Sequence, residues 1–140
     1  MKEGRLHRVR PRPVRVLEDG RGRLVKAFPP EVVRAAASAG GEVYFVTFAP
    51  GAVRGGHYHE TAREWFVPVQ GRVRCELADP ETFGRVGLFL DAVRPEILEV
   101  PPGIAHRFRA LTEGAVLLAF TDRFHDPGKG DTRAFDFQGD

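Results

Sequence analysis

A small set of side chains in this sequence has the composition of a metal site. His57, His59 and Glu64 follow one another closely, and His106 lies later in the chain. Together they include three of the five histidines among 140 residues. Imidazole nitrogens combined with a carboxylate oxygen are typical ligands of divalent first-row metals. We therefore expect these four residues to bind one divalent cation. Zinc is the expected metal, with iron, manganese, nickel and copper as alternatives.

The spacing of these residues fits convergence from three β-strands. Side chains two apart in a strand point to the same face, so His57 and His59 should project together and Tyr58 should point away. Glu64 follows a four-residue gap that suits a turn into the next strand. His106 comes directly after a proline-glycine turn, which fixes its approach at the start of a later strand. The site should keep open positions for water or substrate.

The elements that must position these ligands are mostly strands. Pro29-Pro30 followed by an alanine-rich run up to Gly40-Gly41 predicts one short helix near the N-terminus. Before it, a turn at Asp19-Gly20-Arg21-Gly22 should join two short strands. After it, short apolar segments bounded by Gly, Pro and Asp predict strands around residues 43–48, 65–69, 73–77, 86–90, 97–100, 106–110 and 115–121. This pattern favours an antiparallel all-β barrel or sandwich.

Length and composition exclude several classes of protein. At 140 residues the chain should form a single domain over 1–140, with an extended arm at 1–13 and a turn-rich tail at 123–140. No apolar run reaches the roughly 18 residues of a membrane span, and the charged N-terminus is unlike a secretory signal. The single Cys75 excludes an intrachain disulfide, which fits a reducing, cytoplasmic setting. A net charge of only +2 argues against nucleic-acid binding.

The histidine stretch resembles the first motif of the cupin family. It reads Gly51, five residues, His57-Tyr58-His59, four residues, Glu64, six residues and Gly71, which matches the whole motif. The second cupin motif is matched in part: Pro101, Gly103 and His106 agree, while its leading glycine falls on Pro95 and its final asparagine on Ala110. The resemblance implies an all-β, single cupin (jelly-roll) barrel with one short N-terminal helix. It also implies metal binding through His57, His59, Glu64 and His106.

A narrower resemblance is to nucleotide-sugar cupins, the dTDP-4-keto-6-deoxyhexose 3,5-epimerases and 3,4-ketoisomerases. Its landmarks are Asp19-Gly20-Arg21-Gly22, Arg54-Gly55-Gly56-His57, Pro80-Glu81-Thr82-Phe83-Gly84 and Pro101-Pro102-Gly103-Ile104-Ala105-His106. The tail, with Phe124-His125-Asp126-Pro127 and Asp131-Thr132, is similar to the C-terminal cupin domain of the capsular polysaccharide assembling protein. The resemblance implies an epimerase or ketoisomerase acting on a nucleotide-diphosphate sugar in surface polysaccharide biosynthesis. It also implies a homodimer, paired here through residues 14–28.

The chemistry implied by that resemblance is proton transfer next to a ketone, where a bound metal could polarise the carbonyl. Arg54 matches the family position for holding the diphosphate, and Arg63 and Arg74 are weaker candidates, because a guanidinium binds phosphate oxygens bidentately. In metal-free epimerases the histidine matching His57 is the base, and the tyrosine that acts as acid falls on Phe120 here.

If His57 binds metal, its lone pair is occupied, and Tyr44, His125 or a metal-bound hydroxide must serve as the base. These alternatives stay open. Two other functions also remain open: a metal-dependent cupin dioxygenase of the germin or quercetinase type, and a non-catalytic cupin that only binds a sugar or a metal.

Overall fold

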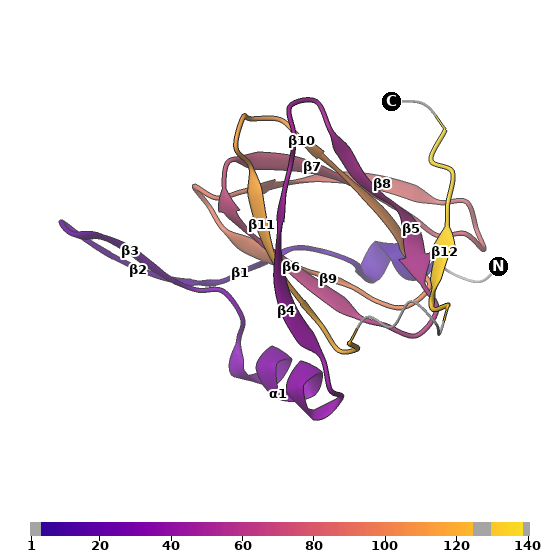
Figure 1. Ribbon diagram of the computed structural model, residues 1–140, viewed down its shortest axis with the longest axis horizontal. Helices are drawn as coiled ribbons and strands as arrows, with labels where there is room; N and C mark the ends of the chain where they lie inside the picture. Colours follow the sequence, from indigo (N-terminus) through magenta and orange to yellow (C-terminus); the bar gives the residue numbers. More distant parts are fainter. Residues whose placement is uncertain (1–3, 125–129, 139–140) are drawn as a thin grey trace.

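The computed structural model describes residues 4–124 and 130–138, whose strands form two five-stranded sheets that face each other (Figure 1). The first sheet has the order β1-β9-β6-β11-β4 and the second β12-β5-β10-β7-β8. The strand bounds are β1 Arg12–Pro13, β4 Glu42–Thr47, β5 Val53–His59, β6 Glu64–Gln70, β7 Arg72–Ala78, β8 Arg85–Asp91, β9 Glu96–Val100, β10 Ala105–Ala110, β11 Val116–Thr121 and β12 Thr132–Ala134. All of these pairings are antiparallel. The predicted all-β cupin barrel is confirmed.

The barrel interior is filled by side chains that alternate along each strand. Cys75 and Leu77 of β7 face Phe66 of β6 and Leu117 of β11 across the core, and all four are buried. This alternation follows from the pleat of a strand, which sends successive side chains to opposite faces. The inner faces of the two sheets therefore form one apolar core, and polar residues that enter it, such as His106, are exceptions.

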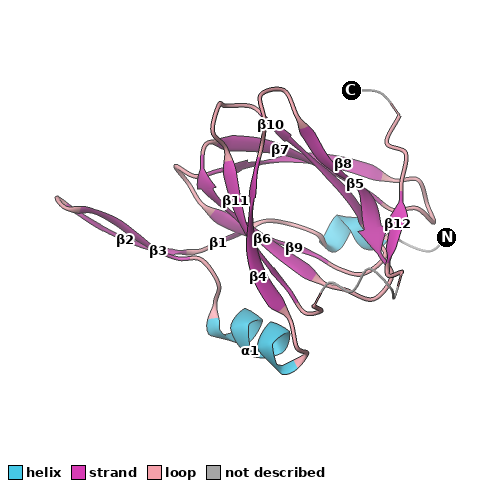
Figure 2. Ribbon diagram, viewed as in Figure 1, coloured by secondary structure: helices cyan, strands magenta, loops and turns pink. Residues whose placement is uncertain are grey.

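The one α-helix of the described chain, α1 (Pro30–Ser38), covers the outer face of the first sheet (Figure 2). Proline at its first position needs no hydrogen-bond donor, and Gly40 takes a positive φ of 77° just after its end. Val32 and Ala36 bury themselves in a second apolar cluster that includes Trp65. The predicted helix is confirmed, and it packs against the outward-facing side chains of β6 and β11.

A two-stranded hairpin, β2 (Arg15–Asp19) with β3 (Gly22–Lys26), projects from the barrel (Figure 1). Asp19 pairs with Gly22, so the predicted Asp-Gly turn is correct. The guanidinium of Arg23 donates to the carbonyls of Ala92 and Val93 at 2.6 and 2.9 Å. Most of the hairpin nevertheless extends away from the body of the protein.

Both ends of the described chain contain elements that the sequence did not predict. A 3-10 helix, η1 (Arg5–Arg8), buries Leu6 within the otherwise extended arm. In the tail, β12 pairs with β5, and Phe135 and Phe137 pack against Tyr58 on the outer face of the second sheet. Segments of three and four residues are too short to display a strand or helix period. Within the described ranges no helix is long and apolar enough to cross a membrane.

Candidate functional site

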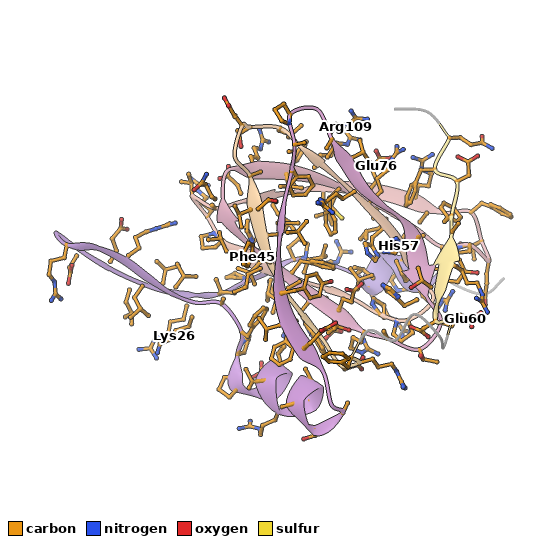
Figure 3. The ribbon with its side chains drawn as sticks, viewed as in Figure 1. Lys26, Phe45, His57, Glu60, Glu76 and Arg109 are labelled. Atoms are coloured by element: carbon orange, nitrogen blue, oxygen red, sulfur yellow. The ribbon has the colours of Figure 1, made fainter. Side chains whose placement is uncertain are left out.

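Three histidines meet inside the barrel near the end of β5. His57 of β5 is paired directly with His106 of β10, and His59 follows on the same face as His57. Their ring centroids lie 4.9 to 6.0 Å apart. One ligand nitrogen from each ring falls within 4.8 Å of the other two. Figure 3 shows His57 among the side chains of the barrel interior. The predicted convergence of these imidazoles is present in the structure.

Glu64 reaches the cluster from the opposite sheet, where it is the first residue of β6. Its Oε1 lies 2.9 Å from Nε2 of His59 and 3.6 Å from Nε2 of His106. Ligand atoms bound at about 2.1 Å around a tetrahedral cation lie about 3.4 Å apart, so both distances suit a shared coordination sphere. Among the described residues, Oε1 of Glu64 and Nδ1 of His106 are buried without a hydrogen-bond partner. The donor set therefore fits a divalent cation.

The charges in this cluster also suit a cation. Burial lowers the pKa of His106 to about 4, although the charge of Glu64 acts in the other direction. Burial also lowers the pKa of His57, and the neighbouring His59 adds to that effect. Both rings are therefore neutral at pH 7, with lone pairs free to bind.

Glu64 and His59 form a coupled acid–base pair within the cluster. Burial acts to raise the pKa of Glu64, but the close contact with His59 and the electrostatic effect of His106 outweigh it and lower the pKa to about 2. Burial acts to lower the pKa of His59, yet its contacts with Glu64 and the charge of Asp131 raise it overall. Glu64 is therefore an anion at every pH of interest.

Tyr44 of β4 supplies a phenol to the same cluster. Its hydroxyl donates to Oε2 of Glu64, and burial together with the negative charge of Glu64 raises its pKa. A phenol with a raised pKa stays protonated at neutral pH, so this hydroxyl acts as a hydrogen-bond donor rather than as a base. Phe120 lies on the other face of β11, edge-on to Phe28 at 5.4 Å in the cluster beneath α1. A tyrosine at position 120 would therefore face the helix, and Tyr44 provides the phenol instead.

The cluster borders a cavity of about 1170 Å³ that opens between the ends of β4, β5 and β11. The sequence reasoning missed several of its lining residues: Glu42, Glu60, Thr61, Thr121, Arg123, Asp131 and Thr132. Thr132 places its Oγ1 3.2 Å from Nδ1 of His59, and Oδ2 of Asp131 lies 3.7 Å from the same nitrogen. Asp131 and Thr132 were noted only in the resemblance of the tail, and no spacing rule connected them with His59.

The three candidate arginines occupy different places. Arg54 donates from Nε to the carbonyl oxygen of Thr47 at 2.7 Å and lies beside the barrel rather than among the residues that line the cavity. Arg63 pairs with Glu99 at 3.0 Å and faces a separate cavity.

Arg74 lies on the outer face of β7, 6.0 Å from the ring centre of Phe89. The structure therefore does not bring Arg63 or Arg74 to the histidines. His125, predicted as a possible base, lies outside the described residues.

Comparisons with known proteins agree with this architecture. Over 95 residues the chain is 30% identical to the UDP-2-acetamido-2,6-beta-L-arabino-hexul-4-ose reductase of Pseudomonas aeruginosa. That match covers 67% of this chain but 26% of the reductase, so the chain spans about a quarter of that relative's length.

Several solved structures share the fold. The 3'-monoepimerase ChmJ of Streptomyces bikiniensis superposes with a TM-score of 0.78 at 21% identity, covering 96% of this chain and 72% of that one. The 3,4-ketoisomerase QdtA of Thermoanaerobacterium thermosaccharolyticum gives a TM-score of 0.72 at 19% identity, with coverages of 89% and 86%. The capsular polysaccharide assembling protein CapF of Staphylococcus aureus gives 0.66 at 21%, with coverages of 89% and 34%.

A family model described as the polysaccharide biosynthesis C-terminal domain matches residues 17–133. That range begins in the hairpin, ends in β12 and includes the four predicted metal ligands, His57, His59, Glu64 and His106. The chain therefore belongs to the polysaccharide biosynthesis C-terminal domain family.

Proposed function

We propose that this chain is an epimerase or ketoisomerase of a nucleotide-linked 4-keto-6-deoxy sugar in polysaccharide biosynthesis. A divalent metal, expected to be zinc, would be held by His57, His59, Glu64 and His106. The observation that carries the proposal is this buried cluster, joined by the Tyr44 hydroxyl, at the wall of a cavity large enough for a sugar. The names of similar proteins support it, since they include a hexul-4-ose reductase, a 3'-monoepimerase and a 3,4-ketoisomerase bound to TDP-4-keto-6-deoxyglucose.

The reaction requires a proton to leave a carbon beside a ketone. The C–H electrons form a carbon–carbon double bond, the carbonyl oxygen becomes an oxyanion, and a proton then returns on another face or atom. A bound divalent cation would supply Lewis acidity to the carbonyl oxygen. Among the residues of the chain, Tyr44 stays protonated and donates to Glu64, which orients that carboxylate beside the histidines.

The role of His57 depends on whether metal is bound. Its lowered pKa leaves a free lone pair at neutral pH, which can either ligate a cation or accept a proton. It cannot do both at the same time. In the metal-bound form we assign His57 to ligation, and another group would take the proton, with His125, outside the described residues, as the remaining side-chain candidate. In a metal-free form His57 would itself be the base.

The charge of the cavity indicates how the substrate would lie. Four carboxylates, those of Glu42, Glu60, Glu64 and Asp131, line it, and Arg123 is the arginine among its described lining residues. Such a lining favours a neutral sugar ring next to a cation rather than a diphosphate. We therefore place the diphosphate at the rim, near Arg123; Arg54, held at the carbonyl of Thr47 at the other end of β4, does not line this cavity.

We further propose that the protein is a homodimer formed through the β2–β3 hairpin. Leu17 and Leu24 of the hairpin are 45% and 51% exposed. An isolated two-stranded hairpin is marginally stable in water, so it needs another surface to pack against. Phe45 on the edge strand β4, 70% exposed, extends an apolar outer face that a second copy could cover (Figure 3).

The test is hydrogen exchange at the sugar. Purified protein is incubated with dTDP- or UDP-4-keto-6-deoxyhexose in heavy water, and the sugar protons are followed by NMR. We expect deuterium at C3 or C5, with the rate reduced at least tenfold in His57→Asn. The exposed His7→Asn variant is the matched control and should exchange at the wild-type rate. Absence of exchange with either nucleotide would rule out the proposed activity.

A further inference from the structure

A second cavity, of about 360 Å³, lies between the N-terminal arm and the loop that follows β9. It shares no described lining residue with the histidine cavity. Six charged residues line it: Arg5, Arg8, Arg10, Arg12, Arg63 and Glu99. The net charge of the whole chain is only +2, so this gathering of five arginines is a local feature and not a consequence of a basic protein.

The carboxylate that lines this cavity, Glu99, and the carboxylate bound by Arg5, Asp79, already have hydrogen-bond partners. Glu99 accepts from Nη1 of Arg63 at 3.0 Å with one oxygen and from Nε1 of Trp65 at 2.8 Å with the other. Arg5 donates to the buried carboxylate of Asp79 at 3.0 Å. Two of the five arginines are therefore neutralised, and both oxygens of the only lining carboxylate among the described residues are in use.

Three arginines remain without an ion pair among the described residues: Arg8, Arg10 and Arg12. The backbone that carries them is extended after η1, and Val9 turns its side chain into the core. Arg8 is the last residue of η1 and Arg10 follows Val9 in the extended segment, and both line the cavity. Arg12 is fixed by the pairing of β1 with β9. The arm thus holds three guanidiniums along one wall.

We propose that this cavity binds a phosphate-bearing anion, with a diphosphate group as the best fit. Like charges held together are unfavourable unless a counter-charge joins them, and the one carboxylate among the described lining residues, Glu99, already pairs with Arg63. All of the cations are arginines, whose planar fork binds two oxygens of a phosphate at once, whereas a lysine acts as a point charge. Three guanidinium groups can together bind several oxygens of a diphosphate.

Pyrophosphate is the probe, measured by calorimetry on chelator-treated protein at constant ionic strength. The test variant is R8S/R10S/R12S. The control variant is R34S/R94S/R109S, which removes the same charge at positions away from the cavity. We expect at least tenfold weaker pyrophosphate binding in the test variant and a change of less than about twofold in the control, since long-range charge effects are screened by salt. Equal weakening in both variants, or no binding by wild type, overturns the proposal.

A third variant, R8K/R10K/R12K, separates geometry from charge. We expect it to bind pyrophosphate several-fold more weakly than wild type, and it also serves if the serine variant fails to fold by circular dichroism. Wild-type affinity in the lysine variant, together with unchanged affinity in a folded serine variant, would refute an arginine site. Parallel titrations with inorganic phosphate and a nucleoside diphosphate identify the source of the group. These titrations measure anion binding at the N-terminal arm, so their outcome is independent of whether the protein catalyses sugar exchange.

Discussion

Burial of His106 should make the metal-free protein less stable as the pH falls. The pKa of this imidazole drops from an ordinary value of 6.5 to about 4 in the folded chain. Between these values the unfolded chain binds a proton that the folded chain does not, so acid favours unfolding. At 1.36 kcal/mol per pKa unit, the full effect is about 3 kcal/mol, with most of it lost by about pH 4.5. The contribution is complete above the unfolded pKa.

His59 acts in the opposite sense and must be separated. Its pKa is raised in the folded state, so its contribution is present below the unfolded pKa and is lost as the pH rises through the folded one. Glu64 has a lowered pKa, so its contribution is present above the unfolded pKa of 4.5 and is lost progressively as the pH falls from there to about 2. Measurements kept at pH 4.5 and above therefore report mainly the cluster histidines, and comparison with a His106 variant isolates His106 from His57 and His59.

The assay is urea unfolding of chelator-treated wild type and His106→Asn between pH 7.5 and 4.5. The difference in unfolding free energy between the two proteins should shrink by about 2 to 3 kcal/mol over this range, because the variant lacks the buried ring. The His7→Asn variant, altered at an exposed ring, should follow wild type. A pH dependence that is the same in wild type and His106→Asn would refute the claim that burial holds this ring neutral.

Three further outcomes follow from the same contacts. Tyr44→Phe removes the hydrogen bond to Glu64, so the free energy of unfolding in urea should fall by about 1 to 3 kcal/mol and sugar exchange should slow at least tenfold. Tyr58→Phe, on the outer face, should leave the exchange rate unchanged. Glu64→Gln should weaken zinc binding at least tenfold in competition with a chelator, and unaltered affinity would exclude the carboxylate as a ligand. Leu17→Glu with Leu24→Glu should convert a dimer to monomers by light scattering; a wild-type monomer would contradict the hairpin interface.

The barrel and its ligand positions were predictable because they depend on local periodicity. Alternation along β5 placed His57 and His59 together and sent Tyr58 outward, and the structure has this arrangement. The same alternation could also have shown that Arg74 does not belong to the site. Cys75 and its neighbours two residues away point inward, so Arg74 between them had to point outward, away from the site.

The remaining features depend on contacts between distant parts of the chain. Asp131 and Thr132 reach His59 only because a three-residue strand pairs with β5, and nothing in so short and polar a segment predicts that pairing. Likewise, the side chain of Arg63 pairs with Glu99, 36 residues later in the chain, and this contact turns it toward the second cavity. Arg63 was a candidate for phosphate binding from the sequence, whereas Asp131 and Thr132 were noted only in the resemblance of the tail.

Elemental analysis of the purified protein is the most direct test of the proposed metal centre. His57, His59, Glu64 and His106 should retain about one divalent ion per chain, with zinc the expected metal, and His106→Asn should retain far less. Chelation should abolish sugar exchange, and restored zinc should return it. Wild-type protein that carries no divalent metal and exchanges deuterium at an unchanged rate in the presence of chelator would contradict the metal centre and assign His57 to proton transfer.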